Sequence, residues 1–247
     1  MLQQATAYEG FIFETFILAS VAIIALLILV KYYQKGKNYM AKLLFFVFLN
    51  WTLAVFFSWL AKIMSAFFEM DTDPPFPPVD LVTLLARYVL DFRLLFVFAS
   101  LALYLSYMLR VQLFDKTYNK GERAINTILV ILAPVLSLSL PLQNSDMIGT
   151  IITFAVMFLF MLIVYSPFMK RAYETYKEVD QKYKGAFASL TVMALFFILS
   201  FLCFLLDQLV VAITEQGFSV FYFAAWICAS LGNLFTYFGY IKPRTGN

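Results

Sequence analysis

Long apolar stretches, separated by short polar connections, constrain the fold of this 247-residue chain more than any other feature. Hydrophobic residues make up 63% of the sequence, whereas only 13% of the residues are charged. A soluble domain of this size typically carries about twice that charged fraction. Several stretches exceed about 18 apolar residues, the length at which a helix can cross the hydrocarbon core of a bilayer. The sequence therefore predicts an integral membrane protein made of α-helices.

Seven such helices can be placed, and residues 1–247 are predicted to form a single all-α seven-helix bundle. The predicted helices cover residues 11–30, 43–68, 80–109, 124–142, 147–168, 185–214 and 217–241. The connections between them are short, so helices that are neighbours in sequence should be antiparallel neighbours in space.

The distribution of Lys and Arg predicts how the bundle is oriented. Of the 18 basic residues, 15 lie in or beside every second connection or follow the last helix, while the other connections carry only acidic charges. Connections rich in Lys and Arg remain in the cytoplasm. We therefore expect the N-terminus outside, the C-terminus in the cytoplasm and a location in the cell membrane. Because the basic residues have this topological explanation, nucleic-acid binding is not expected.

Six charged residues interrupt the apolar pattern near the predicted outer ends of four helices. They are Glu14, Lys62, Arg87, Asp91, Arg93 and Asp207. Counted at 1.5 Å per residue from the basic residue at the inner end of the same helix, they lie about 26 to 35 Å away, near the outer edge of the hydrocarbon core. Charged side chains at that depth are costly in lipid, so their presence requires an explanation.

Two interpretations of these six charges remain open. In one, they line a cup that opens to the outside and binds a small polar or charged ligand. In the other, they form ion pairs and anchors that fix the depth of the helices. Arg87 and Asp91 are four residues apart and could pair within one helix. Arg93 points away from Asp91 and needs another partner, such as Glu14, Asp207 or a lipid phosphate.

Two amides form a second polar level closer to the cytoplasm. Asn50 and Asn233 lie roughly 12 to 14 Å above the inner basic residues of their helices. The spacing favours an interhelical hydrogen bond between amides, as is common inside membrane bundles. The alternative is a polar step in a path for ions.

The absence of histidine excludes several kinds of chemistry. Without His, the chain cannot form a His-ligated haem or metal site, or a Ser/His or Cys/His catalytic pair. No other pairing of a nucleophile with a base is visible. We therefore expect neither an enzyme nor a metal or haem cofactor.

The last predicted helix carries the residues that bear on family resemblance. It reads FSVFYFAAWICASLGNLFTYFGYI and continues into GYIKPR. It has no lysine that could bind retinal as a Schiff base, so a retinal cofactor is not expected. The phenylalanine-rich helices, the long sixth helix and the GYIKPR exit resemble the seven-helix sensory input modules of prokaryotic histidine-kinase-type membrane proteins.

This resemblance implies a receptor-like sensor, in which the six charged residues would form an outward-facing polar pocket. Its expected partners are membrane lipids, a small polar ligand from outside, and a separate signalling partner in the cytoplasm or membrane. Two alternatives remain open: a transporter or channel for small solutes or ions, and a structural or accessory subunit of a membrane complex.

Overall fold

The computed structural model describes residues 2–34, 39–67, 81–90, 92–115, 117–139, 147–214 and 218–241, and these ranges are all helical apart from short turns. The helices within them are α1 (Leu2–Gln34), α2 (Tyr39–Phe67), α3 (Leu81–Leu90), α4 (Arg93–Arg110), α5 (Lys120–Ser139), α6 (Met147–Glu178), α7 (Gln181–Thr214) and α8 (Val220–Thr236). Two π-helical segments, η1 (Val111–Asp115) and η2 (Tyr237–Ile241), continue α4 and α8. In the described ranges, seven helices are long and apolar enough to cross a membrane. The prediction of a multi-pass helical protein with seven spans is thereby confirmed.

The spanning helices are apolar on both faces. One face packs against other helices, and the other is exposed at the surface of the bundle. In α1, Val21 and Ile28 are buried, whereas Phe16 and Ile23 have exposed fractions of 72% and 55%. A helix that is apolar all round suits a lipid environment, where the outer face meets acyl chains.

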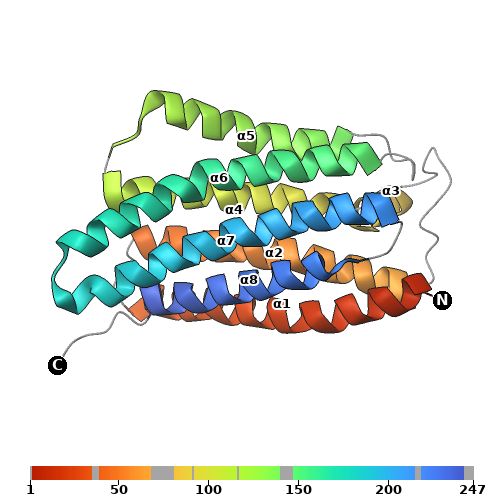
Figure 1. Ribbon diagram of the computed structural model, residues 1–247, viewed down its shortest axis with the longest axis horizontal. Coiled ribbons are helices and arrows are strands. Elements are labelled where there is room, and N and C mark those ends of the chain that lie inside the picture. Colours follow the sequence, from red (N-terminus) through yellow and green to blue (C-terminus); the bar gives the residue numbers. More distant parts are fainter. Residues whose placement is uncertain are drawn as a thin grey trace.

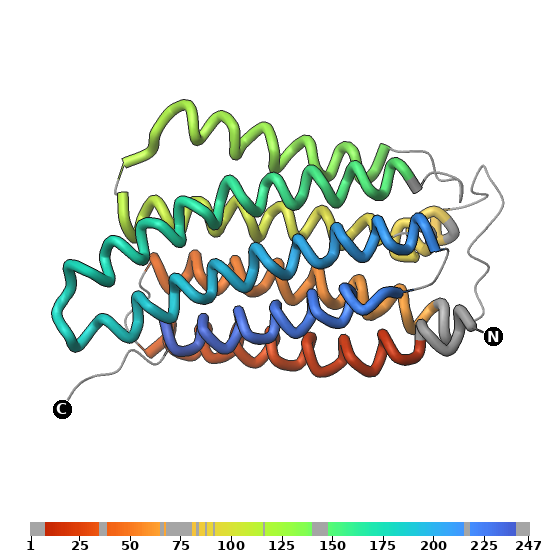
Figure 2. Tube along the Cα trace, viewed as in Figure 1, coloured from red at the N-terminus to blue at the C-terminus, as the bar shows by residue number. Residues whose placement is uncertain are grey.

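The seven spans lie side by side along the length of the bundle (Figure 1). Each long helix packs against the next one in sequence, and α8 returns to pack against α1. Helix α4 also contacts α6 directly, which leaves α5 at the periphery. Figure 2 shows α5 along one edge of the bundle and α1 along the opposite edge.

The buried side chains form two hydrophobic clusters. The α4–α7 cluster includes residues such as Leu103, Phe160 and Phe197 and draws mainly on helices α4 to α7. The α1–α2–α8 cluster contains residues such as Val21 and Trp226. The bundle thus has two packed halves that are joined through α2 and α4, because Ala54 of α2 belongs to the first cluster and Leu109 of α4 to the second.

The structure corrects the predicted continuous helix over residues 80–109. The chain leaves the helical conformation at Phe92, which has φ 58° and ψ 15° and separates α3 from α4. The amide of Phe92 donates a hydrogen bond to the carbonyl of Val89 (3.0 Å), which closes a tight turn. An L-residue rarely adopts this left-handed conformation. No glycine or proline stands beside Phe92, so the sequence pattern alone could not locate the break.

Several predicted helix ends also differ from the observed ones. The predicted helices over 147–168 and 185–214 extend further, as α6 and α7, and are joined by a tight turn after Glu178. Ion pairs of Glu174 with Lys170 and Arg171 support this charged extension of α6. The last helix begins at Val220 rather than at 217 because the Ser219 hydroxyl accepts a hydrogen bond from the Phe221 amide and caps it.

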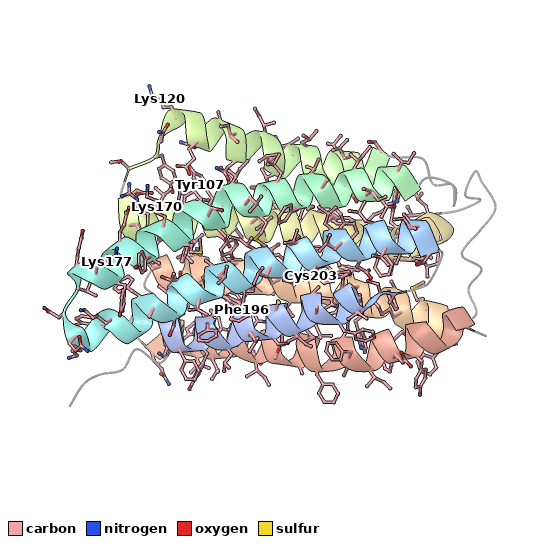
Figure 3. All side chains as sticks on the ribbon, viewed as in Figure 1. Tyr107, Lys120, Lys170, Lys177, Phe196 and Cys203 are labelled. Carbon is pink, nitrogen blue, oxygen red and sulfur yellow. The ribbon has the colours of Figure 1, made fainter. Side chains whose placement is uncertain are left out.

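Basic residues gather at one end of the bundle. Figure 3 shows Lys120, Lys170 and Lys177 at the end opposite the start of α1. The α6–α7 hairpin projects furthest at this basic end, and α1 begins at the other end (Figure 1). The observed separation of charge is the one that the positive-inside rule requires, while the orientation in a membrane stays a prediction.

Candidate functional site

A buried ion pair lies near the end of the bundle that is opposite the basic end. The Nζ atom of Lys62 is 2.6 Å from Oε1 of Glu14, and the two side chains have exposed fractions of 3% and 0%. The same Glu14 oxygen also accepts hydrogen bonds from Ser58 Oγ (2.9 Å) and Tyr222 OH (2.7 Å). The carboxylate therefore ties together α1, α2 and α8.

Aromatic rings enclose the Lys62 ammonium group. Its Nζ atom lies 4.9 Å from the ring centroid of Phe92, 5.4 Å from that of Phe218 and 5.2 Å from that of Tyr222. The ring faces carry negative electrostatic potential and stabilise a cation. Lys62 also donates a hydrogen bond to Ser58 Oγ (3.1 Å). Its charge is thus satisfied by one carboxylate, one hydroxyl and three rings.

Gly10 allows α1 to approach this group closely. A Cβ atom at Gly10 would lie 2.9 Å from Cε of Lys62 and 3.2 Å from Cε2 of Phe218. Real Cβ atoms almost never make contacts shorter than 3.0 Å. The absence of a side chain at this position is therefore part of how the Lys62 stem fits between the helices.

Asp207, on α7, is 1% exposed and fixes the start of α8. Its Oδ1 atom accepts hydrogen bonds from the backbone N–H (2.8 Å) and the hydroxyl (2.7 Å) of Ser219. Gln208 Nε2 donates to the other oxygen at 3.3 Å. Since Ser219 caps α8, the carboxylate of Asp207 stabilises the junction between the last two helices.

A cavity of about 230 Å³ extends inward from this ionic group. It is lined by residues of α1, α2, α4, α6, α7 and α8, together with Phe92 and Phe218, and none of its lining residues comes from α5. On α7 the lining residues run from Phe197 to Val211, which corresponds to about 21 Å of helix. The cavity is therefore elongated, with Glu14, Lys62 and Asp207 near its outer end and mostly apolar walls.

Packed aromatic residues lie next to the inner end of the cavity. Trp51 stacks against Phe197 with ring centroids 6.3 Å apart, and Phe197 contacts Tyr165 at 5.4 Å. Closer to the basic end, Tyr107 and Phe168 are 0% and 1% exposed. This layer separates the cavity from the basic end of the bundle.

The structure brings together three of the six charged residues singled out from the sequence. Glu14, Lys62 and Asp207 line the cavity. Asp91 lies outside the described residues, and of Arg87 only the backbone is described, so the predicted pair between them cannot be placed.

Arg93 does not line the cavity and joins α4 to α5. Its Nη1 atom donates a hydrogen bond to the carbonyl of Ser137 (2.8 Å), and Ser137 Oγ donates to the carbonyl of Arg93 (3.2 Å). Ser137 lies in the last turn of α5, where the carbonyls have no donor within the helix. A cation at a helix C-terminus also interacts favourably with the helix dipole. Arg93 therefore caps α5.

The two amides predicted to lie at an inner level have different environments. Asn50 Nδ2 donates to the carbonyl of Phe46 in its own helix (2.8 Å). Asn233 is 5% exposed and lines the cavity. Among the described residues, no hydrogen bond joins these two amides.

Several residues of the site were not identified from the sequence. Ser58 lies four residues before Lys62, and this spacing would have placed the two on one helix face. Tyr222 is one of 15 tyrosines, and nothing in its neighbourhood distinguishes it. Phe92 and Gly10 act through backbone conformation and close approach, which composition does not reveal.

A second ionic cluster joins helices at the basic end. Arg110, which is 2% exposed, pairs with Glu122 at the start of α5 and lies 3.7 Å from Asp115. Asp115 Oδ1 in turn forms an ion pair with Arg171 Nε of α6 at 3.2 Å. Arg110 was interpreted from the sequence only as a basic residue beside an inner connection; in the structure it fastens α4, η1 and α5 together.

Comparison with known proteins returns no match: no family model, no curated protein and no solved structure is significantly similar to this chain. A search of the described residues for groups of metal-ligating side chains also finds none.

Proposed function

We propose that this protein is a receptor-like membrane sensor that binds a small molecule in its central cavity. The observation that carries this proposal is the cavity itself, which has a buried Glu14–Lys62 pair at one end and mostly apolar walls. Ligand sites typically combine apolar walls with a few well-placed polar groups. Ionisable residues inside membrane bundles are also often functional.

The proposed orientation places the ionic end of the cavity outside. The basic end of the bundle, which includes Lys120, Lys170 and Lys177 (Figure 3), would then face the cytoplasm. A ligand would enter from the outer side, and a partner would be contacted at the inner side.

Helix α7 connects the cavity to the basic end and could transmit a signal between them. It lines the cavity from Phe197 to Val211 and continues to Gln181 at the tip of the α6–α7 hairpin. Its 34 residues correspond to about 51 Å of continuous helix. A shift of α7 at the cavity would be carried to a projecting surface that bears Lys, Arg and Tyr side chains.

Transport is the second candidate, and Asn233 is the observation in its favour. This amide places a polar group on the wall of the cavity, as a path for a solute would require. Against transport, Trp51, Phe197 and Tyr165 pack next to the inner end, and Asn50 does not line the cavity. Uptake of solute into proteoliposomes would distinguish a transporter from a sensor.

Native mass spectrometry of the protein in lipid nanodiscs tests the proposed ligand site. We expect a small molecule to be retained by the unmodified protein and lost from Ala229→Phe, because Ala229 lines the cavity. Ile227→Phe is the matched control, since Ile227 lies on the same helix, is 51% exposed and does not line the cavity. Equal retention by the two variants would place the bound molecule elsewhere and contradict the proposal.

A further inference from the structure

We propose that the cavity accepts an amphipathic organic cation, with an amine or ammonium group beside Glu14 and an apolar chain along the cavity. This inference rests on the proposed function, because it requires the cavity to be a ligand site. It specifies the charge and shape of the ligand, which the proposed function leaves open.

The charges that line the cavity favour a cation. Among the described lining residues, Glu14 and Asp207 carry negative charge and Lys62 carries positive charge, so one negative charge is in excess. Lys62 is already bonded to Glu14 and Ser58 and enclosed by three rings. An anionic ligand would therefore find the local cation engaged and two carboxylates nearby.

The hydrogen bonds of Glu14 are distributed unevenly between its two oxygens. Oε1 accepts from Lys62, Ser58 and Tyr222. Oε2 is buried and has no hydrogen-bond partner among the described residues. A buried carboxylate oxygen without a donor is unfavourable, because it has lost its hydration without replacement. The N–H groups of an amine would supply the missing donor.

Aromatic side chains surround the outer part of the cavity and add a second attraction for a cation. Phe218 stacks on Tyr222 with ring centroids 4.2 Å apart, and Phe204 contacts Trp226 at 5.0 Å. All four residues line the cavity. Aromatic faces attract ammonium groups, and this attraction grows where water is excluded.

The remaining length of the cavity sets the shape of the ligand. Its walls inward of the ionic group include Val55, Phe96, Phe201 and Ala229, which offer no charge. An apolar chain would bury its surface there, whereas a compact cation such as a metal ion would leave this space unfilled. The ligand class is thus an amine with an extended apolar body.

Three probes of equal chain length separate head-group charge from hydrophobicity. They are octylamine, which is cationic at neutral pH, 1-octanol, which is neutral, and octanoate, which is anionic. Binding to the protein in nanodiscs is measured by equilibrium dialysis, with empty nanodiscs giving the background from partition into lipid. We expect octylamine to bind about tenfold or more tightly than 1-octanol, and octanoate to bind most weakly.

Substitutions of the two members of the ion pair should have opposite effects on octylamine binding. Glu14→Gln should weaken octylamine binding by about tenfold or more, whereas Lys62→Met should bind it at least as tightly as the unmodified protein. Both substitutions disturb the same buried pair, so a purely structural effect would move the two affinities in the same direction. Asp207→Asn, which keeps a hydrogen-bond acceptor, should also weaken octylamine binding.

The outcomes separate this inference from the proposed function. Equal binding of octylamine and 1-octanol, both lost in Ala229→Phe, would overturn the preference for a cation but keep the ligand site. Preferential binding of octanoate would also overturn it. If none of the probes bound above background, or if Ala229→Phe changed nothing, both the inference and the ligand site would be contradicted.

Discussion

The ring of Phe92 lies over the ammonium group of Lys62, with 4.9 Å between Nζ and the ring centroid. The left-handed backbone of Phe92 that separates α3 from α4 thus belongs to a residue that also encloses the buried cation. For an L-residue this conformation costs about 1 to 2 kcal/mol. Strained backbone of this kind is often found at functional sites, and here it lies against the cavity.

Replacing Phe92 by leucine tests the value of this contact. Phe92→Leu keeps a bulky apolar residue but removes the aromatic face, so we expect the free energy of unfolding to fall by about 1 to 2 kcal/mol. Phe16→Leu is the control, because Phe16 is 72% exposed on the outer face of α1. Thermal unfolding of the two variants in the same detergent measures the difference; equal midpoints would contradict a role for the ring.

The Glu14–Lys62 pair should behave as a unit. We expect Glu14→Gln or Lys62→Met alone to lower the free energy of unfolding by about 3 to 5 kcal/mol, because each leaves a buried charge without its partner. The double variant should be less destabilised than the sum of the single variants, since it leaves neither charge behind. Chemical unfolding of all four proteins gives the coupling energy, and a coupling near zero would show that the two groups do not interact.

We expect the stability of the fold to depend more on the hydrogen-bond acceptor at position 207 than on its negative charge. Asp207→Asn retains an oxygen that can accept from the Ser219 amide and hydroxyl, whereas Asp207→Leu does not. We expect the leucine variant to lose about 1 to 3 kcal/mol more than the asparagine variant, because two donors of the α8 cap are then unsatisfied. Hydrogen exchange at the first turn of α8 reports the loss, and identical exchange in both variants would argue against this role.

Gly10 offers a test of close packing around Lys62. Gly10→Ala should destabilise the protein, since the new Cβ atom would lie 2.9 Å from the Lys62 side chain. The expected cost is about 1 to 3 kcal/mol, as for other overpacked sites. Gly121→Ala should be neutral or stabilising, because the closest atom to its Cβ is Asn119 Oδ1 at 3.5 Å. Equal thermal stability of the two variants would mean that Lys62 adapts without cost.

Arg110 should determine how firmly α5 is held at the basic end. We expect Arg110→Gln to increase hydrogen exchange in the first turns of α5, because it removes the ion pair with Glu122. Arg123→Gln is a suitable control, as Arg123 is exposed in the same helix. If the two variants exchanged alike, the anchoring of α5 would depend on its apolar contacts with α4 and α6 instead.

The spans could be predicted because their apolar length is a property of single segments. The same reasoning located the depth of the charges, which is why Glu14, Lys62 and Asp207 were expected at one level. Depth alone does not say which way each side chain points around its helix axis. The pairing of Glu14 with Lys62 and the separate role of Arg93 therefore could not be predicted from depth.

Other features of the site depend on contacts between distant segments. Phe92 lies between Asp91 and Arg93, with no glycine or proline beside it, so no residue that favours positive φ marks the left-handed turn. Tyr222 joins Glu14 across 208 positions of sequence, a contact that periodicity cannot suggest. The inner cluster around Arg110 was missed because its partners, Asp115 and Glu122, follow in a segment interpreted only as a charged connection.

The seam between the two packed halves runs through the cavity. Val21 and Trp226, from the α1–α2–α8 cluster, line one side, and Phe96 and Phe201, from the α4–α7 cluster, line the other. A molecule bound there would hold the two halves apart, and its width would set the distance between them. A slim occupant and a bulky one would then leave the far tips of the helices in different places, even though neither touches them.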